Sequence, residues 1–84
     1  MKEPSVQELA LHLVRPLVKN PDVVEVHEAE GRQGAELRLS LDPQDVGRVI
    51  GRQGRTISAL RNLVQVASRN ADESIRLEIE EPEG

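Results

Sequence analysis

Two segments with helical hydrophobic spacing meet at the four residues Gly51-Arg52-Gln53-Gly54, and this interruption constrains the fold more than any other feature of the sequence. Asp42-Pro43 is a typical helix start, with Asp as the N-cap and Pro at the first helical position, so a short helix is expected over 42–50. A longer helix is expected over 55–69. Gly51 can adopt a positive φ that stops the first helix, and Gly54 lets another backbone approach closely. The sequence therefore predicts two helices joined by a tight loop.

The remaining elements follow from the spacing of apolar residues elsewhere in the chain. A capping box at Ser5 to Glu8 predicts a helix over 5–18, with Pro16 kinking it or marking its last turn. Strands are expected over 23–29, 35–41 and 75–79, the first two forming an antiparallel hairpin through a turn at 30–34. A second turn is expected at 70–72. The order α-β-β-α-α-β predicts an α+β fold with a three-stranded sheet packed against three helices.

Length and composition limit the domain count and the chemistry. The 84 residues are enough for one domain over 1–84, with an ordered core at about 5–80. Phe, Trp and Tyr are absent, so the core is aliphatic and RNA readers that stack bases on aromatic rings are excluded. The absence of cysteine excludes disulfides and thiolate chemistry and suits a cytoplasmic location. We expect no signal peptide and no membrane span.

Positive charge is concentrated around the predicted loop. The window 46–71 contains five arginines and no acidic residue, whereas the rest of the chain has six basic and fifteen acidic residues, which gives −4 overall. A local cluster of positive charge is typical of a nucleic-acid binder, even though the net charge of the whole chain is negative. A solvated helix face is the alternative interpretation, because runs of like charge are commonly only surface.

The loop itself has the features of a phosphate-binding site. The N-terminus of a helix presents free N–H groups and a partial positive charge, so a phosphate placed there meets donors directly. Arg52 and Arg55 add charge beside it. The alternative is a helix-turn-helix connection whose glycines serve geometry alone.

The segment Val49-Ile50-Gly51-Arg52-Gln53-Gly54 resembles the KH signature, an apolar pair followed by G-x-x-G with basic or polar middle residues. The element order is similar to the type II, or bacterial, KH arrangement. From Asp45 to Ile57 the chain looks especially like the small bacterial single-KH-domain RNA-binding proteins, and the resemblance extends from about Val6 to Ile79. It implies that the loop clamps the backbone of single-stranded RNA over about four nucleotides.

The resemblance also implies which side chains contact RNA. Backbone contacts fall to the four loop residues, and Arg48 and Arg55 flank them. Val49, Ile50 and Ile57 are expected to line the apolar floor of the site, although each also suits a core position. The resemblance also implies that bases lie in a groove between the loop and the sheet. Arg38 is expected either to point toward this groove or, more simply, to lie on a solvated strand face.

A second apolar stripe lies on the helix predicted over 55–69. Ile57, Leu60, Val64 and Ala67 form the side that docks on the sheet, and Ala59, Leu63 and Val66 fall on a separate arc about 100° away. Such residues can be scattered surface positions or a dimer interface. The resemblance implies a homodimer, and pairing with a larger protein that carries a KH domain.

No catalytic, metal or cofactor site is expected. His12 and His27 are isolated from other ligand-type residues, and no serine carries a nucleophile signature. The leading interpretation is therefore an RNA-binding protein of low sequence selectivity, a small regulatory RNA chaperone and not an enzyme. The alternatives are an interaction subunit that dimerises and recruits a partner, with RNA contact secondary, and a DNA-binding helix-turn-helix protein.

Overall fold

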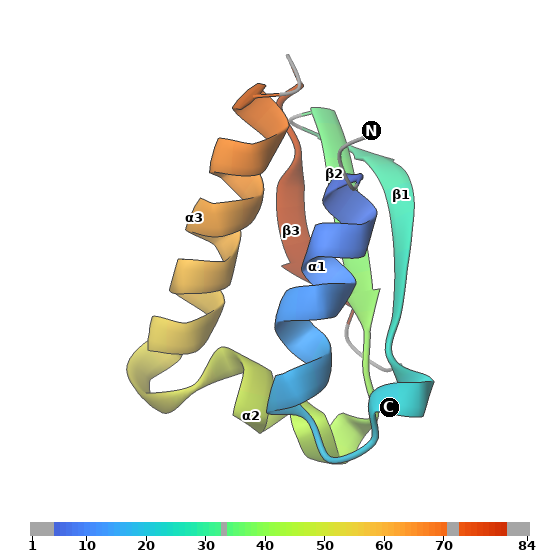
Figure 1. The fold of residues 1–84 in the computed structure, drawn as a ribbon, viewed down its shortest axis with the longest axis vertical. Helices are drawn as coiled ribbons and strands as arrows, with labels where there is room; N and C mark the ends of the chain where they lie inside the picture. Colours follow the sequence, from blue (N-terminus) through green and yellow to red (C-terminus); the bar gives the residue numbers. More distant parts are fainter. Residues whose placement is uncertain (1–4, 33, 71–72, 81–84) are drawn as a thin grey trace.

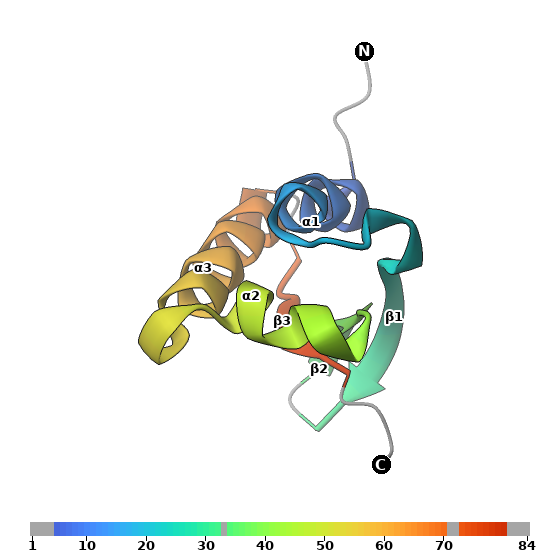
Figure 2. The ribbon, with the colours of Figure 1, turned by 90° about the horizontal axis from the view of Figure 1, so that it is seen from below.

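The computed structural model describes residues 5–32, 34–70 and 73–80. Their elements follow the order α-β-β-α-α-β, joined in places by single 3₁₀ turns. Helices α1 and α3 lie side by side over the sheet, and α2 crosses below them (Figures 1 and 2). Within these ranges no helix combines the length and apolar character that crossing a membrane requires. The predicted α+β fold is confirmed.

The first helix has the predicted cap and the predicted break. Helix α1 spans Val6–Val14, and the Ser5 hydroxyl accepts a hydrogen bond from the Glu8 backbone N–H at 3.1 Å. Beyond Val14 the chain tightens into a 3₁₀ turn that contains Pro16. A proline inside a helix removes a backbone donor and clashes with the preceding turn, so the regular helix ends before it.

The sheet has the order β1-β2-β3. Strand β1 (Glu25–Gly31) pairs antiparallel with β2 (Gly34–Ser40), which confirms the hairpin, and β2 pairs parallel with β3 (Arg76–Ile79). The predicted start of the first strand at Val23 is wrong. A 3₁₀ turn occupies Pro21–Val23, and Val24 donates to the Pro21 carbonyl at 3.2 Å, so extended pairing begins only at Glu25.

One hydrophobic core joins the helices to the sheet. Leu37 and Leu39 of β2 and Leu77 of β3 are almost fully buried, and they meet Val14 of α1 and Val64 of α3. Alternate residues of the same strands, such as Arg38, point to the opposite, exposed face. The core is aliphatic, as the composition predicts.

The connection between α3 and β3 is anchored by a buried serine. The Ser68 hydroxyl donates to the Gln65 carbonyl at 2.9 Å and accepts from the Ile75 backbone N–H at 3.3 Å. These bonds tie the last turn of α3 (Arg55–Asn70) to the start of β3. Of the predicted turn at 70–72, Ala71 and Asp72 lie outside the described residues, as does Gln33 of the predicted turn at 30–34.

Candidate nucleic-acid interface

The loop between α2 and α3 has an unusual backbone. Helix α2 (Val46–Ile50) ends where Gly51, at φ 74°, donates its N–H to the Gly47 carbonyl at 3.0 Å. Gln53 (φ 56°) and Gly54 (φ 73°) are also in the left-handed region, and α3 begins at Arg55. A positive φ is uncommon for a residue with a side chain. Three positive-φ residues within four positions turn the chain sharply and hold the Gln53 side chain at the exposed tip.

Glycine is required at the two ends of the loop for different structural reasons. A Cβ at Gly51 would lie 2.7 Å from the Cβ of Thr56, so side-chain packing from α3 adds to the conformational demand there. Nothing lies within 4 Å of a Cβ built on Gly54. Gly54 is therefore required by its backbone angle, and the space beside it is open to an approaching ligand.

Polar and charged side chains gather around this loop. Arg48, Arg52, Gln53 and Arg55 are all exposed. Arg55 donates to the Gln53 side-chain carbonyl at 3.3 Å, a bond that orders the two side chains next to the start of α3. Arg48 lies on α2 with its Nε 3.5 Å from a carboxylate oxygen of Asp45. The structure therefore brings these four side chains together on one helix-loop-helix unit.

The apolar residues proposed for the site divide into two groups. Val49 is completely buried and Ile57 is nearly so. Both residues lie in the core, which was the alternative expected for them. Ile50 is 37% exposed and lies immediately before the loop. Of the three, only Ile50 offers a substantial apolar surface to a ligand.

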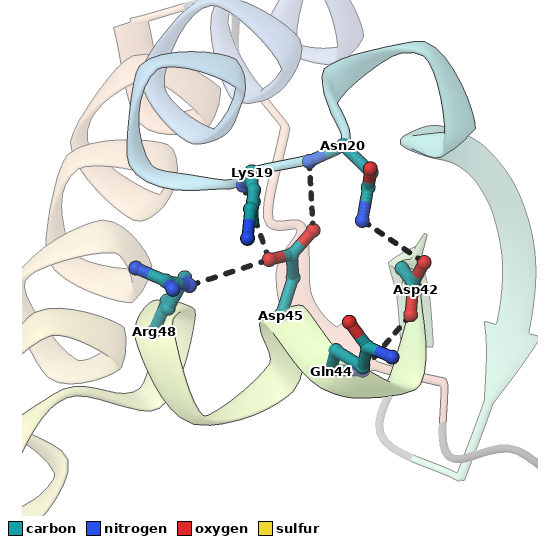
Figure 3. A network of polar contacts seen from close by, with 6 residues as sticks. All are labelled: Lys19, Asn20, Asp42, Gln44, Asp45 and Arg48. Carbon is teal, nitrogen blue, oxygen red and sulfur yellow. Dashed lines mark hydrogen bonds and ion pairs between the residues drawn. The ribbon is translucent and has the colours of Figure 1, made fainter.

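Sequence reasoning missed Asp45, which fixes α2 in place. Its carboxylate is buried, and it accepts hydrogen bonds from the backbone N–H groups of Lys19 at 3.1 Å and Asn20 at 3.0 Å (Figure 3). The Asn20 side chain donates in turn to Asp42 at 3.0 Å, and Asp42 caps the 3₁₀ turn before α2 as predicted. The segment after α1 is thereby tied to the base of the loop-bearing unit.

These partners set the ionisation of Asp45. Burial acts to raise the pKa of the Asp45 carboxyl, but the hydrogen bonds from the Lys19 and Asn20 amides and the charge of Arg48 outweigh it. The pKa of Asp45 therefore lies below its ordinary value of 3.8. A carboxylate fully satisfied by backbone donors is a permanent negative charge at neutral pH. This charge orients the guanidinium group of Arg48. The Arg48 side chain is 57% exposed, so it is still accessible to a ligand.

The exposed face of the sheet carries mixed charge. Arg38 pairs with Glu36 at 3.6 Å there, so it occupies the solvated strand face. His27 contacts Glu80 at 2.9 Å on the same sheet. In the described ranges, no cluster of three or more His, Asp or Glu side chains could hold a metal ion.

The second apolar stripe on α3 is exposed. Leu63 is 50% and Val66 56% accessible, and Ala59 is exposed beside them. The docking residues Leu60 and Val64 are buried on the other side of the helix. The two arcs predicted for this helix are therefore present, and within residues 5–32, 34–70 and 73–80 nothing covers the outer arc.

Comparison with known proteins gives a consistent family. Residues 7–79 match the family model described as KhpA/KhpB, KH domain. The RNA-binding protein KhpA of Caldanaerobacter subterraneus is 42% identical over 72 residues, covering 86% of this chain and 96% of the relative. The protein of the same name from Bacillus subtilis is 39% identical over 79 residues, covering 94% and 98%. The chain therefore belongs to the KhpA/KhpB family of KH domains.

Proposed function

We propose that this protein binds single-stranded RNA by gripping its sugar–phosphate backbone with the loop Gly51–Gly54. The observation that carries the proposal is the loop backbone: left-handed Gln53 between two positive-φ glycines presents the loop at the start of a 16-residue helix. The segregated positive charge supports it. The relatives also support it, because they are named RNA-binding proteins. Their names describe no reaction, which agrees with the expectation that the protein is not an enzyme.

The grip works through charge and backbone donors together. The Arg55 N–H donates to the Arg52 carbonyl in the preceding 3₁₀ turn. The N–H groups that follow it in the first turn of α3 have no partners inside the helix, and the helix dipole is positive there. A phosphate beside Gly54 meets these donors and the guanidinium groups of Arg52 and Arg55. Arg48, held by Asp45 at 3.5 Å, extends the positive surface along α2. Such contacts favour any strand that offers phosphates at the right spacing.

This grip favours single strands and low sequence selectivity. Phosphate contacts position a strand but carry no base information, and the sequence has no Phe, Trp or Tyr to stack on bases. A base next to the gripped backbone packs instead against aliphatic surface such as Ile50. Low sequence selectivity supports our proposal that the protein acts as a small regulatory RNA chaperone, which we expect in the cytoplasm.

A matched pair of charge reversals tests the grip. Arg52→Asp changes the loop, and Arg15→Asp makes the same charge change at an exposed position after α1. Fluorescence anisotropy with a labelled single-stranded RNA is expected to show binding lost in Arg52→Asp and reduced only slightly in Arg15→Asp. Equal losses in both folded variants would mean that net charge, and not the loop, determines binding.

A second candidate function is supported by the exposed stripe of Ala59, Leu63 and Val66. A self-complementary apolar face on α3 suits a homodimer, or a complex with a larger KH-domain protein, with RNA contact secondary. Leu63→Asp is expected to leave the fold intact and to halve the mass measured by light scattering, whereas His12→Asp on α1 leaves it unchanged. A monomeric native protein would remove this candidate. A monomeric Leu63→Asp variant with native RNA affinity would separate the two functions.

A further inference from the structure

A hollow of about 450 Å³ lies on the outer face of the sheet, which is turned away from α1 and α3 (Figure 1). This volume is within the range of small-molecule sites in proteins. Three arginines and three glutamates line the hollow, and Gly31 at the end of β1 borders it. The ends of β1 and β2 that meet in the hairpin lie at the opposite end of the molecule from α2 (Figure 1). The hollow is therefore separate from the loop Gly51–Gly54.

Glu36 of β2 supplies a carboxylate that is held in place inside this hollow. A Cβ built on Gly31 would overlap the Glu36 carboxylate, so glycine at this position leaves the room that Glu36 occupies. Arg38 lies 3.6 Å from one carboxylate oxygen, which is an ion pair but is longer than a hydrogen bond. Among the residues that the structure describes, no buried side-chain oxygen lacks a hydrogen-bond partner, and no hydrogen bond to Glu36 is found. Although the Glu36 side chain is only 18% exposed, its carboxylate oxygens therefore reach the hollow.

The other charges of the hollow include an occupied glutamate and an available arginine. Glu78 pairs at 3.2 Å with Arg61 of α3, which also donates to the Leu77 carbonyl at 3.1 Å. Arg76 is the register partner of Glu36 on β3 and is exposed. Within the described part of the chain, Arg76 forms no ion pair. The hollow thus offers a carboxylate as an acceptor and a guanidinium group for an anion.

This combination of groups matches a guanine nucleotide. Guanine has two adjacent donors on one edge, N1–H and the N2 amino group, and one carboxylate can accept from both. Adenine has an acceptor at N1, which a carboxylate repels. Guanidinium planes can stack on a base, so the lack of Phe, Trp and Tyr does not prevent binding. A phosphate on the same nucleotide can pair with Arg76.

We propose that this hollow binds a free guanine mononucleotide, with Glu36 reading the base and Arg76 pairing with the phosphate. The site is independent of the proposed RNA grip. A free nucleotide is favoured over a guanine within a strand, because Glu25 and Glu28 of β1 are exposed and repel the additional phosphates of RNA. The alternative is a set of cross-strand ion pairs that only stabilises the sheet.

NMR titration of the ¹⁵N-labelled protein with the 5′-monophosphates of guanosine, inosine and adenosine tests the proposal. Hypoxanthine, the base of inosine, lacks the N2 amino group. Affinity is expected to fall in the order guanosine, inosine, adenosine, with about tenfold between the first two, because one hydrogen bond to a charged group is lost. The amides of Gly31, Glu36 and Arg76 are expected to shift. An oligouridine with one central guanine is expected to shift the loop amides and to leave these three unmoved.

Three substitutions separate base recognition from the phosphate contact. Glu36→Gln is expected to remove the guanine preference, because its amide places a donor opposite one of the guanine donors. Gly31→Ala is expected to displace Glu36 and to reduce the preference, without the cost of a positive φ. Arg76→Gln is expected to lower the affinity for all three nucleotides and to keep their order. Glu73→Gln, at an exposed position before β3, is the matched control and leaves all three affinities unchanged.

Several outcomes would overturn the proposal. These are no binding of the guanine nucleotide, equal affinity for all three nucleotides, or the same shifts and affinity with inorganic phosphate alone. A guanine preference that survives in Glu36→Gln, or shifts confined to the loop Gly51–Gly54, would overturn it as well. So would shifts of the hollow with the strand but not with the mononucleotide. Arg52→Asp is expected to keep nucleotide binding whatever its effect on RNA, so failure of the hollow and failure of the grip are distinguishable.

Discussion

The carboxylate of Asp45 accepts a hydrogen bond of 3.0 Å from the backbone N–H of Asn20, which lies 25 positions earlier in the chain. With the Lys19 bond at 3.1 Å, this contact joins the end of the first helical segment to the start of the unit that carries the loop. The loop is exposed and contributes little to the core. Its position therefore depends on the packing of α2 through Val49 and on this buried carboxylate.

Replacing Asp45 by Asn is expected to destabilise the fold more than its small change in shape suggests. An amide can accept from one of the two backbone N–H groups, but its own NH₂ then faces the other donor. Asp22→Asn, at an exposed position in the 3₁₀ turn before β1, is the matched control. Thermal unfolding should show a midpoint lowered by several degrees for Asp45→Asn and unchanged for Asp22→Asn. Equal midpoints would contradict the anchoring role.

The same carboxylate makes stability depend on pH in a defined direction. Because the folded-state pKa of Asp45 lies below 3.8, its ionised form stabilises the native state above that value, and this contribution is lost as the pH falls through the folded-state pKa. The stability difference between the native protein and Asp45→Asn should therefore be constant from about pH 7 to about pH 5 and shrink as the pH falls below about 4. Urea unfolding of both proteins measures it. A difference that grows on acidification would reverse the assigned shift.

Three glycine-to-alanine substitutions separate the energetic cost of a positive φ from the cost of side-chain overlap. Gly51→Ala is expected to cost about 2 kcal/mol or more, because it combines a positive φ with overlap on Thr56. Gly54→Ala meets open space and should cost about 1 kcal/mol. Gly47→Ala, inside α2 with nothing within 4 Å, should stabilise by about 0.5–1 kcal/mol. Chemical denaturation gives the order, and a Gly54→Ala cost above that of Gly51→Ala would be inconsistent with the loop geometry.

Much of this architecture can be predicted from the sequence because its signals are local. Helix caps at Ser5 and Asp42, the break near Pro16 and the alternation in β2 each involve residues within a few positions of one another. The predicted start of the first strand at Val23 was wrong because two local signals compete there. Two valines indicate extended structure, but Pro21 starts a turn that includes the first of them.

The residues that sequence reasoning missed act through distant partners. Asp45 and Asn20 are 25 positions apart, and Arg61 and Leu77 are 16 apart, so no spacing rule connects either pair. Their local patterns are ordinary: an acidic residue near a helix start, and an arginine at the border of an amphipathic helix. The parallel pairing of β3 with β2 is likewise a tertiary result, which alternation within one strand cannot reveal.

RNA affinity should depend on salt in proportion to the phosphates gripped. For single strands the slope of log affinity against log salt changes by about 0.7 for each phosphate neutralised. Arg52→Gln is expected to flatten the slope by about that amount, while Arg32→Gln, in the turn after β1, leaves it unchanged. Anisotropy titrations at several salt concentrations give both slopes. An Arg52→Gln slope identical to the native one would indicate that this arginine does not touch phosphate.

The loop's contact with RNA is tested most directly by NMR titration of the ¹⁵N-labelled protein with a short single-stranded RNA. The account predicts that the largest amide shifts occur at Gly51–Gly54 and in the first turn of α3, with little change for His27 and Arg38 on the outer face of the sheet. Shifts concentrated on that outer face, with the loop amides unmoved, would contradict it.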